Sequence, residues 1–222
     1  MDGIRAVGFD LDGTFMKTRV DYSKLDSADR RVCLEHGIPF DDIDFGDSPK
    51  RPRAPIRDWL EANGRGDEFE KVSGDIDRAF TECEVEFVSE AVPFPGSAES
   101  LDIIRSKGLK VGLLTRGSLE YARRALGPLY DRFDFVMGRD HSDYDNAKPS
   151  PVAMREFAEG LGVRPEEILY VGDNTTDWMS AHGAGARFVG VRTGSGSDEL
   201  WNRVDPSITV IDYAGDVIRL LP

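Results

Sequence analysis

Two carboxylates stand two residues apart where the first apolar run of the chain ends. The run leads into Phe9-Asp10-Leu11-Asp12-Gly13-Thr14, which places both acids at the carboxyl end of a predicted strand. Two acids this close repel each other unless a cation or a substrate group stabilises them. Gly13 permits the sharp turn that lets a phosphate come close to the backbone. A hard divalent cation with oxygen ligands, such as Mg²⁺, would fit this pair.

Three later segments carry groups suited to the same chemistry. Thr115-Arg116-Gly117 offers a hydroxyl and free backbone N–H groups where a helix begins, which is a ready site for an anion. Lys148 stands directly before the helix start at Ser150-Pro151, from where its ammonium could reach a phosphate as a point charge. Asp173 and Asp177 follow another apolar run and suit a metal ion. Taken singly, the first of these segments is an ordinary helix cap and the second an ordinary solvated lysine.

The elements that must position these groups are predicted from short apolar runs rich in β-branched residues. Each run is followed by a turn and a stretch with helical periodicity, which is typical of an α/β fold with a parallel sheet covered by helices. We predict strands at residues 4–9, 109–114, 133–137, 168–171, 187–191 and 208–211. Open sheets of this kind bind ligands at the carboxyl ends of their strands, and the acids above follow two of those ends.

A long insertion separates the first two strands. About a hundred residues lie between them, far more than the dozen or so that one helical crossover requires. We therefore predict a helical domain at 16–92, inserted in a core formed by 1–15 and 93–222. One of its helices is predicted to open at Ser23-x-x-Asp26 and another to cover 75–88, and Pro93-Phe94-Pro95-Gly96 is predicted to be a hinge.

Composition narrows the function classes. The net charge of −13 argues against a nucleic-acid or anionic-membrane partner, because either would need a basic face. The N-terminus lacks the basic start and apolar run of a signal peptide, and no segment is long enough to span a bilayer, so a cytoplasmic protein is expected. Two cysteines and three histidines show no metal-site spacing, which leaves zinc and haem without support.

Two further segments stand out by composition. Lys50-Arg51-Pro52-Arg53-Ala54-Pro55-Ile56-Arg57 is a basic island in an acidic chain, and its ordinary explanation is a solvated loop that balances nearby aspartates. The functional hypothesis is that Arg51, Arg53 or Arg57 reaches the core cleft and pairs with a substrate carboxylate. Gly194-Ser195-Gly196-Ser197 is most simply a flexible connection.

The order of the chemical groups resembles the four motifs of the haloacid dehalogenase superfamily. These motifs match Asp10 with Asp12, Thr115, Lys148, and Asp173 with Asp177. The resemblance covers 1–15 and 93–222, and it implies a Rossmann-like parallel-sheet core. By position and helical character alone, the insertion looks like the helical cap of the subfamily that includes phosphoglycolate phosphatases and β-phosphoglucomutases.

The resemblance also implies a role for each group. Asp10 would attack phosphorus and form an aspartyl-phosphate, while Asp12 would protonate the leaving oxygen and then deprotonate the attacking water. The ligands of Mg²⁺ would be Asp10, the backbone carbonyl of Asp12, Asp173, and Asp177 directly or through a water. The groups that hold the phosphoryl oxygens would be Thr115, the N–H groups of Arg116 and Gly117, and Lys148. The substrate would be a small phosphorylated metabolite, with phosphoglycolate as a model.

Other activities of the superfamily are weighed against the same residues. Members that cleave carbon–halogen bonds lack the second aspartate, so Asp12 argues for phosphoryl transfer. Members that hydrolyse phosphonates use a cap lysine as a Schiff base, but the lysines of the insertion lie in polar stretches that would not depress a pKa. Those lysines are Lys17, Lys24, Lys50 and Lys71. A phosphomutase and a binding module without turnover remain open alternatives.

Overall fold

A six-stranded parallel sheet, in the order β5-β4-β1-β6-β7-β8, forms the body of the molecule. The computed structural model describes residues 3–46 and 51–221. The strands are β1 (Ala6–Phe9), β4 (Lys110–Leu114), β5 (Phe135–Met137), β6 (Ile168–Gly172), β7 (Arg187–Val191) and β8 (Thr209–Ile211). β1 and β6 are buried throughout, which explains why their sequences are continuously apolar rather than alternating. The predicted α/β fold and its six strands are confirmed.

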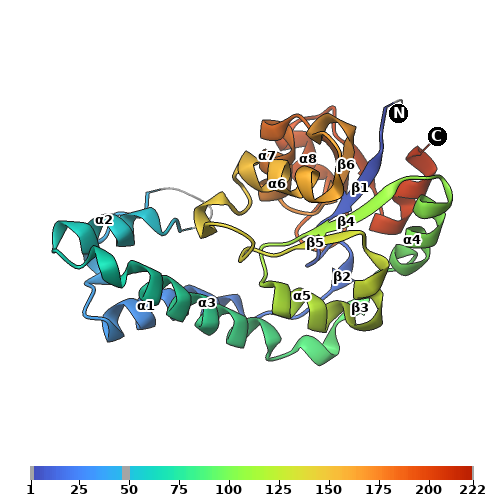
Figure 1. Cartoon of the computed structure of the whole chain (residues 1–222). Helices are drawn as coiled ribbons and strands as arrows, with labels where there is room; N and C mark the ends of the chain where they lie inside the picture. Colours follow the sequence, from blue (N-terminus) through green and yellow to red (C-terminus); the bar gives the residue numbers. More distant parts are fainter. Residues whose placement is uncertain (1–2, 47–50, 222) are drawn as a thin grey trace.

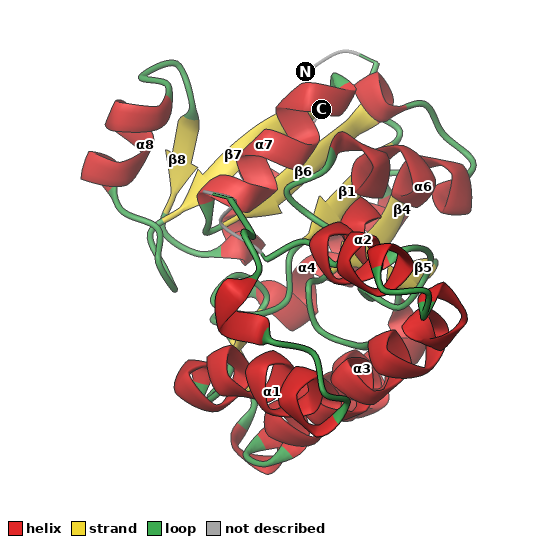
Figure 2. Ribbon diagram, turned by 90° about the vertical axis from the view of Figure 1, so that its left-hand side faces the viewer, coloured by secondary structure: helices red, strands yellow, loops and turns green. Residues whose placement is uncertain are grey.

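Helices cover both faces of this sheet (Figure 2). They are α4 (Ser97–Ser106), α5 (Leu119–Leu126), α6 (Pro151–Leu161), α7 (Thr175–Ala184) and α8 (Asp198–Val204). Alternate residues of β1 face opposite layers: Val7 joins the apolar cluster under α4 and α5, whereas Ala6 joins the cluster under α6. The central strand is therefore held from both sides, and the carboxyl group that follows it starts from a rigid position.

Close packing under α6 depends on glycine at two strand positions. The Phe157 ring lies over Gly8 of β1 and Gly112 of β4, where an added Cβ would come within 2.7 Å and 2.5 Å of ring carbons. Real Cβ atoms do not approach a neighbour so closely, so a side chain at either position would push α6 away from the sheet. These glycines bring the helix close to β1, which leads into Asp10, and to the neighbouring strand β4.

A second body of helices is inserted after β1 and extends away from the sheet (Figure 1). Its helices are α1 (Tyr22–Glu35), α2 (Ala54–Ala62) and α3 (Phe69–Val85), packed around an apolar cluster of their own. The chain leaves the core through β2 (Met16–Lys17) and returns through β3 (Val92–Pro93), which pair antiparallel. We call residues 16–92 the helical insertion.

The ends of two insertion helices differ from the predictions. α1 begins at Tyr22 rather than Ser23, because the Asp21 side chain is the cap that accepts from the N–H groups of Ser23 and Lys24. α3 begins at Phe69 rather than at residue 75, and buried Phe69 and Val72 continue its apolar face into these first turns. The segment predicted to be a hinge begins at Pro93, which is the last residue of β3 and pairs with Met16 of β2.

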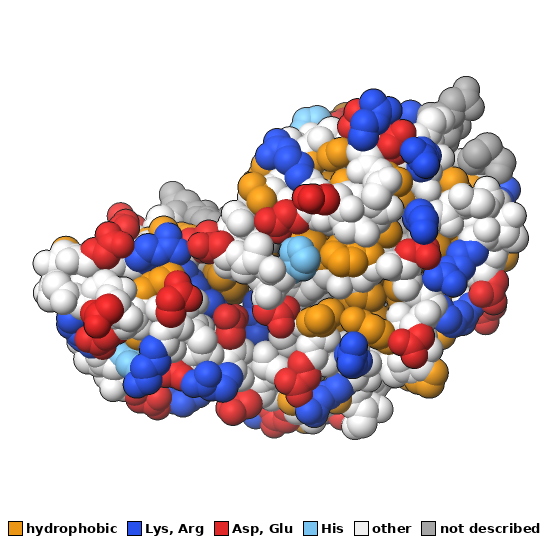
Figure 3. Space-filling model, in the orientation of Figure 1, with side chains coloured by type: hydrophobic (Ala, Val, Ile, Leu, Met, Phe, Trp, Pro, Cys, Tyr) orange, Lys and Arg blue, Asp and Glu red, His pale blue; other side chains and the backbone are white. Residues whose placement is uncertain are grey.

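The face of the molecule shown in Figure 3 carries charges of both signs. On the face shown in Figure 3, acidic and basic side chains are interspersed, and the residues coloured there form no extended basic patch. A polyanion would meet carboxylates and cations together on this face. None of the described helices is long and apolar enough to cross a lipid bilayer.

Candidate active site

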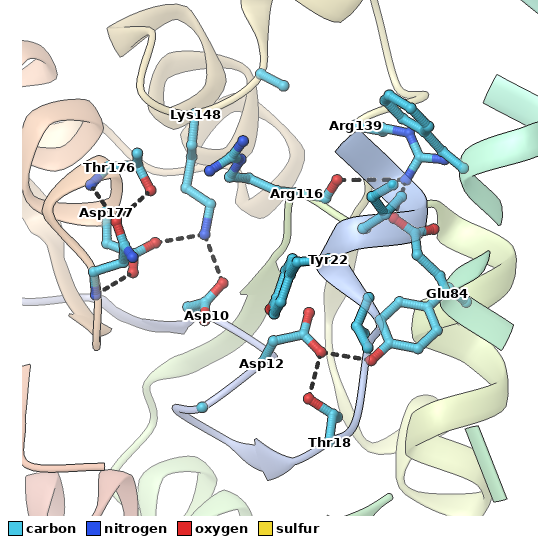
Figure 4. A pocket seen from close by; sticks show the side chains of 18 of the residues that line it. Asp10, Asp12, Thr18, Tyr22, Glu84, Arg116, Arg139, Lys148, Thr176 and Asp177 are labelled. Carbon is cyan, nitrogen blue, oxygen red and sulfur yellow. Dashed lines mark hydrogen bonds and ion pairs between the residues drawn. The ribbon is translucent and has the colours of Figure 1, made fainter. Parts of the chain in front are cut away.

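A cavity of about 880 Å³ lies between the carboxyl ends of the central strands and the helical insertion. The core contributes Asp10, Lys148 and Asp173 to its wall, and the insertion contributes Tyr22 and Arg51. Figure 4 shows that the core side chains enter it from several separate elements. A ligand in this cavity would touch both bodies of the protein.

Three carboxylates from two strand ends converge at one end of the cavity. Asp10, Asp173 and Asp177 each place one carboxylate oxygen within 4.8 Å of the others, and all three side chains are buried. Burial raises the pKa of Asp10 well above its usual range; nearby Lys148 lowers it, and the neighbouring carboxylates raise it again. Asp10 and both acids that follow β6 are thus brought together, whereas the Asp12 side chain is not part of this cluster.

Lys148 lies among these acids. Its Nζ donates to Asp10 Oδ1 at 2.7 Å and to Asp177 Oδ1 at 2.5 Å, and it also contacts the hydroxyl of Tyr170 and the Leu114 carbonyl, each at 2.9 Å. The side chain is only 1% exposed. Burial alone would lower the pKa of Lys148, but Asp10 and Asp177 more than offset this and raise it. The lysine therefore stays protonated and holds two of the acids in place.

Asp173 is fixed by a loop that sequence analysis assigned to a flexible connection. Ser195 donates its N–H and its hydroxyl to Asp173 Oδ2, at 2.7 Å and 2.8 Å, and Thr14 donates to Oδ1 at 3.2 Å. Gly13 and Gly194, both at positive φ, allow these loops to touch, since a Cβ on Gly13 would lie 2.8 Å from the Gly194 Cα. Burial, more than the charge of Asp177, raises the pKa of Asp173 to about 6.

The Asp12 side chain is held by two hydroxyl groups. Tyr121 of α5 and Thr18 of the insertion both donate to Asp12 Oδ1, at 2.5 Å and 2.7 Å (Figure 4). Burial raises the pKa of Asp12, and the two hydroxyl donors counteract part of that rise. Asp10 and Asp12, two residues apart, thus have different partners. Neither hydroxyl group belongs to a motif that could be recognised in the sequence.

The turn after β4 differs in detail from the expectation. The Thr115 hydroxyl is buried and accepts a hydrogen bond from the Gly117 N–H at 2.9 Å, so two groups expected to hold phosphoryl oxygens bond to each other. A turn hydroxyl in this position commonly satisfies the N–H two residues on. Arg116 and Gly117 line the cavity.

A buried ion pair joins the helical insertion to this turn. Arg139, two residues after β5, pairs with Glu84 of α3, and both side chains are less than a tenth exposed. Glu84 also accepts from the Ser118 N–H and hydroxyl, each at 3.2 Å. Arg139 further contacts Asp77 and Thr81 of the same helix. The turn that follows β4 and the helical insertion are therefore connected through one network of charged side chains.

The basic island of the insertion is engaged mostly in ion pairs outside the cavity. Arg53 forms a two-point pair with Asp77 at 2.9 Å, and Arg57 pairs with Asp143 at 2.9 Å. Of the three arginines considered from sequence, Arg51 alone lines the cavity, where Asp29 contacts it at 3.0 Å. Lys50 lies outside the described residues.

Comparison with known proteins decides the family. The model of the haloacid dehalogenase-like hydrolases matches residues 4–185. The chain belongs to this family. The matched region runs from the first strand to the end of α7 and so includes every converging acid and Lys148.

Relatives of this haloacid dehalogenase-like hydrolase include two curated phosphatases. A phosphoglycolate phosphatase from Pseudomonas putida is 29% identical over 98% of this chain and 79% of its own length. A phosphatase from Mycobacterium tuberculosis is 31% identical over 85% of either protein. The crystal structure of a β-phosphoglucomutase from Clostridium difficile matches 96% of this chain and 93% of its own, with a TM-score of 0.61 at 22% identity. This last similarity shows a shared fold.

The acid cluster of this hydrolase suits a hard divalent cation. Its three buried carboxylates face one lysine, so the cluster carries more negative than positive charge in a place where charge is costly. Carboxylate oxygens are the ligands that Mg²⁺ prefers. The three carboxylates therefore fit Mg²⁺, the metal that phosphatases of the haloacid dehalogenase family generally use.

Proposed function

We propose that this hydrolase is a Mg²⁺-dependent phosphatase that cleaves a small phosphorylated metabolite, similar to phosphoglycolate, through an aspartyl-phosphate on Asp10. The observation that carries the proposal is the convergence of Asp10 with Lys148, Asp173 and Asp177 at the wall of a cavity. Asp12, two residues on, has its own set of partners. This is the arrangement needed for a nucleophile and a separate proton-transfer group.

Asp10 is proposed as the nucleophile. A carboxylate must be ionised to attack phosphorus, and Lys148 at 2.7 Å favours that form against the effect of burial. Attack splits one difficult displacement into the formation and the hydrolysis of a phosphoenzyme. Because Asp10 follows the buried strand β1, its backbone is held in place, and its carboxylate can be oriented toward the phosphorus atom before reaction.

Asp12 is proposed as the general acid and base. Its two hydroxyl partners orient the carboxyl group, which would protonate the leaving oxygen and later take a proton from the attacking water. Thr18 belongs to the helical insertion, so a movement of the insertion would reach Asp12 directly.

The remaining groups are proposed to offset the negative charge of the phosphate and of the attacking carboxylate. Mg²⁺ held by Asp10, the Asp12 carbonyl, Asp173 and Asp177 would supply positive charge against the repulsion between the carboxylate and the phosphate. The proposed partners of the phosphoryl oxygens are Lys148, the Thr115 hydroxyl and the N–H groups of Arg116 and Gly117, of which the Gly117 N–H would first have to leave the Thr115 oxygen. We also propose that residues 16–92 contribute to the selection of the substrate, while 1–15 and 93–222 carry out catalysis.

Phosphonate hydrolysis through a Schiff base finds no support in the described part of the chain. Lys17, Lys24 and Lys71 are absent from the cavity wall, and Lys24 pairs with Glu86 at 2.6 Å. A Schiff-base lysine has to reach the substrate carbonyl from the insertion. The proposal therefore stays with phosphate esters.

Removing the metal is expected to abolish phosphate release. Phosphate would be measured from a panel of small phosphate esters in Mg²⁺, in excess chelator, and after Mg²⁺ is restored. Ca²⁺ should inhibit, because it accepts more ligands in a looser geometry and misplaces the attacking oxygen. Release that continues undiminished in chelator would contradict the proposed role of the acid cluster.

Ser195→Ala is expected to weaken Mg²⁺ binding by about 10-fold to 100-fold, the usual effect of losing a group that orients a metal ligand. The variant removes one of two Ser195 donors to Asp173 Oδ2. Calorimetric titration with Mg²⁺ measures the affinity without turnover. Ser207→Ala is the matched control, since its hydroxyl also bonds an aspartate, Asp205, but it does not line the cavity. Equal affinities in both variants would show that Ser195 does not support the metal site.

A further inference from the structure

One basic side chain of the cavity has no acidic partner among the side chains that the structure describes. Four basic residues line the wall within the described part of the chain: Arg51, Arg116, Arg139 and Lys148. Arg51 pairs with Asp29, Arg139 with Glu84, and Lys148 with two carboxylates of the acid cluster. For Arg116, the described residues provide neither an ion pair nor a hydrogen bond to the guanidinium.

Arg116 is placed close to the proposed phosphoryl site by the chain itself. It lies between Thr115 and Gly117, and its backbone carbonyl accepts from Arg139 at 3.5 Å. In the view of Figure 4 its side chain runs from this anchored backbone toward the part of the cavity that holds Lys148. The Arg116 side chain therefore belongs to the core, at the turn after β4, and not to the helical insertion.

The positive charge of Arg116 affects the pKa of two tyrosines of the cavity. Desolvation and the carboxylates of Asp12 and Asp10 raise the pKa of Tyr22, and Arg116 counteracts that rise. Burial likewise raises the pKa of Tyr144, and Arg116 is among the cations that lower it. Both tyrosines line the cavity. The charge of Arg116 is therefore felt inside the cavity, between the acid cluster and the insertion.

The other charged groups of the cavity indicate what Arg116 could bind. The wall is rich in carboxylates, and an anionic substrate would be repelled by them unless cations compensate. Lys148 is already shared between two acids, whereas Arg116 has no such partner among the described side chains. An arginine presents a planar fork that matches a carboxylate at two points, which gives it both affinity and geometric selectivity.

We propose that the Arg116 side chain binds a second anionic group of the substrate, a carboxylate a few bonds from the phosphate ester. The substrate class is then small phosphorylated carboxylic acids. This inference rests on the proposed phosphatase function and deepens it. It also transfers the role considered for the basic island of the insertion to a residue of the core, because Arg53 and Arg57 are committed elsewhere and Arg51 is paired with Asp29.

The test uses two substrates that differ in the second anion alone. 2-Phosphoglycolate and 2-hydroxyethyl phosphate have the same ester and nearly the same length, but only the first carries a carboxylate. The wild type should show the higher kcat/KM for 2-phosphoglycolate. Arg116→Gln should lower the ratio of the two kcat/KM values by about 10-fold or more, the usual weight of a charge-assisted hydrogen bond. Arg116→Lys should retain part of the ratio, because it keeps the charge but loses the fork.

Arg124→Gln is the matched control. Arg124 lies on α5, is exposed, and pairs with Glu120, so the variant removes the same charge without touching the cavity wall. Its substrate ratio should equal that of the wild type. A wild type without preference for the carboxylate, or an Arg116→Gln variant that loses activity equally on both esters, overturns the inference.

A binding measurement separates this inference from the proposed function. 3-Phosphonopropanoate and 3-hydroxypropylphosphonate replace the ester oxygen with carbon, so they report recognition without phosphate ester hydrolysis. Calorimetry in Mg²⁺ should show tighter binding of 3-phosphonopropanoate to the wild type, and Arg116→Gln should reduce that advantage by about 10-fold or more. If the advantage depends on Arg116 but no ester is hydrolysed, the inference stands and the proposed phosphatase function fails. If esters are hydrolysed but the advantage is independent of Arg116, the reverse holds.

Discussion

Asp10→Asn is expected to abolish turnover and to form no phosphoenzyme with any substrate. The change keeps the size of the side chain and removes the nucleophilic charge, and it also weakens the acid cluster with Asp173 and Asp177. Loss of a covalent nucleophile lowers kcat by about 10⁶ in hydrolases where it has been measured. Lys148 would face an amide instead of a carboxylate, so its ion pair with Asp177 would be the one left.

Asp12→Asn is expected to behave differently. Removing general acid and base help costs about 10²-fold to 10⁴-fold, and the cost is greatest when the leaving group is a poor one such as an alkoxide. An activated aryl phosphate leaves without a proton. The variant should therefore keep a larger share of the first, phosphoryl-transfer step with an aryl phosphate than with an alkyl phosphate. Hydrolysis of the aspartyl-phosphate also needs the base, so phosphoenzyme should accumulate.

Rapid-quench burst kinetics on both variants with both kinds of ester measures these steps. Asp102→Asn is the control for the chemical change, because Asp102 is exposed on α4 and pairs with Arg132. It should react as the wild type does. A burst from Asp10→Asn, or equal first-step losses with both esters in Asp12→Asn, would mean that the two carboxylates are assigned wrongly.

Arg139→Met is expected to lower the free energy of unfolding by about 3–5 kcal/mol. It removes one partner of a buried ion pair and leaves Glu84 as a charge with too few partners, which is the costly way to break such a pair. Ser118 would still donate to Glu84, but two hydrogen bonds from a neutral residue do not replace a guanidinium. Urea denaturation followed by fluorescence and circular dichroism measures the loss.

Two further variants decide whether that loss comes from the pair. Glu84→Leu combined with Arg139→Met removes both charges and should recover part of the lost stability, since an apolar pair of similar volume tolerates burial. Arg105→Met removes an exposed arginine that contacts Asp134 at 3.4 Å, and it should cost less than about 1 kcal/mol. A loss as small as that in Arg139→Met would show that the network contributes little to stability.

The sheet and the acid cluster could be predicted because each leaves a local signal. Buried parallel strands such as β1 and β6 are continuous apolar runs, and they can be recognised from a few residues. An acid directly after such a run has its position fixed by the sheet. Asp10 and Asp173 therefore came together as expected, since β1 and β6 are neighbours in register.

The supporting residues could not be predicted, because their partners lie far away in the chain. Tyr121 is 109 positions from Asp12, and Arg139 is 55 from Glu84. Ser195 is 22 residues from Asp173, and its glycine-rich surroundings are those of a mobile linker. Its place after β7, at the edge of the sheet where ligands bind, was the one signal that could have pointed to it.

The pairing of β2 with β3 makes the helical insertion an exchangeable cassette. Met16 lies opposite Pro93 and Lys17 opposite Val92, so the two points where the chain leaves and re-enters the core are adjacent. Another segment with similarly close ends could replace the insertion and leave β1 and its neighbours in register, at a loop-closure cost that rises only slowly with length. The exchange has two conditions, because the incoming segment would have to supply a carboxylate for Arg139 and a hydroxyl donor for Asp12 in place of Thr18. On the proposed division of roles, such grafting would change the substrate and leave the proposed catalytic residues in place.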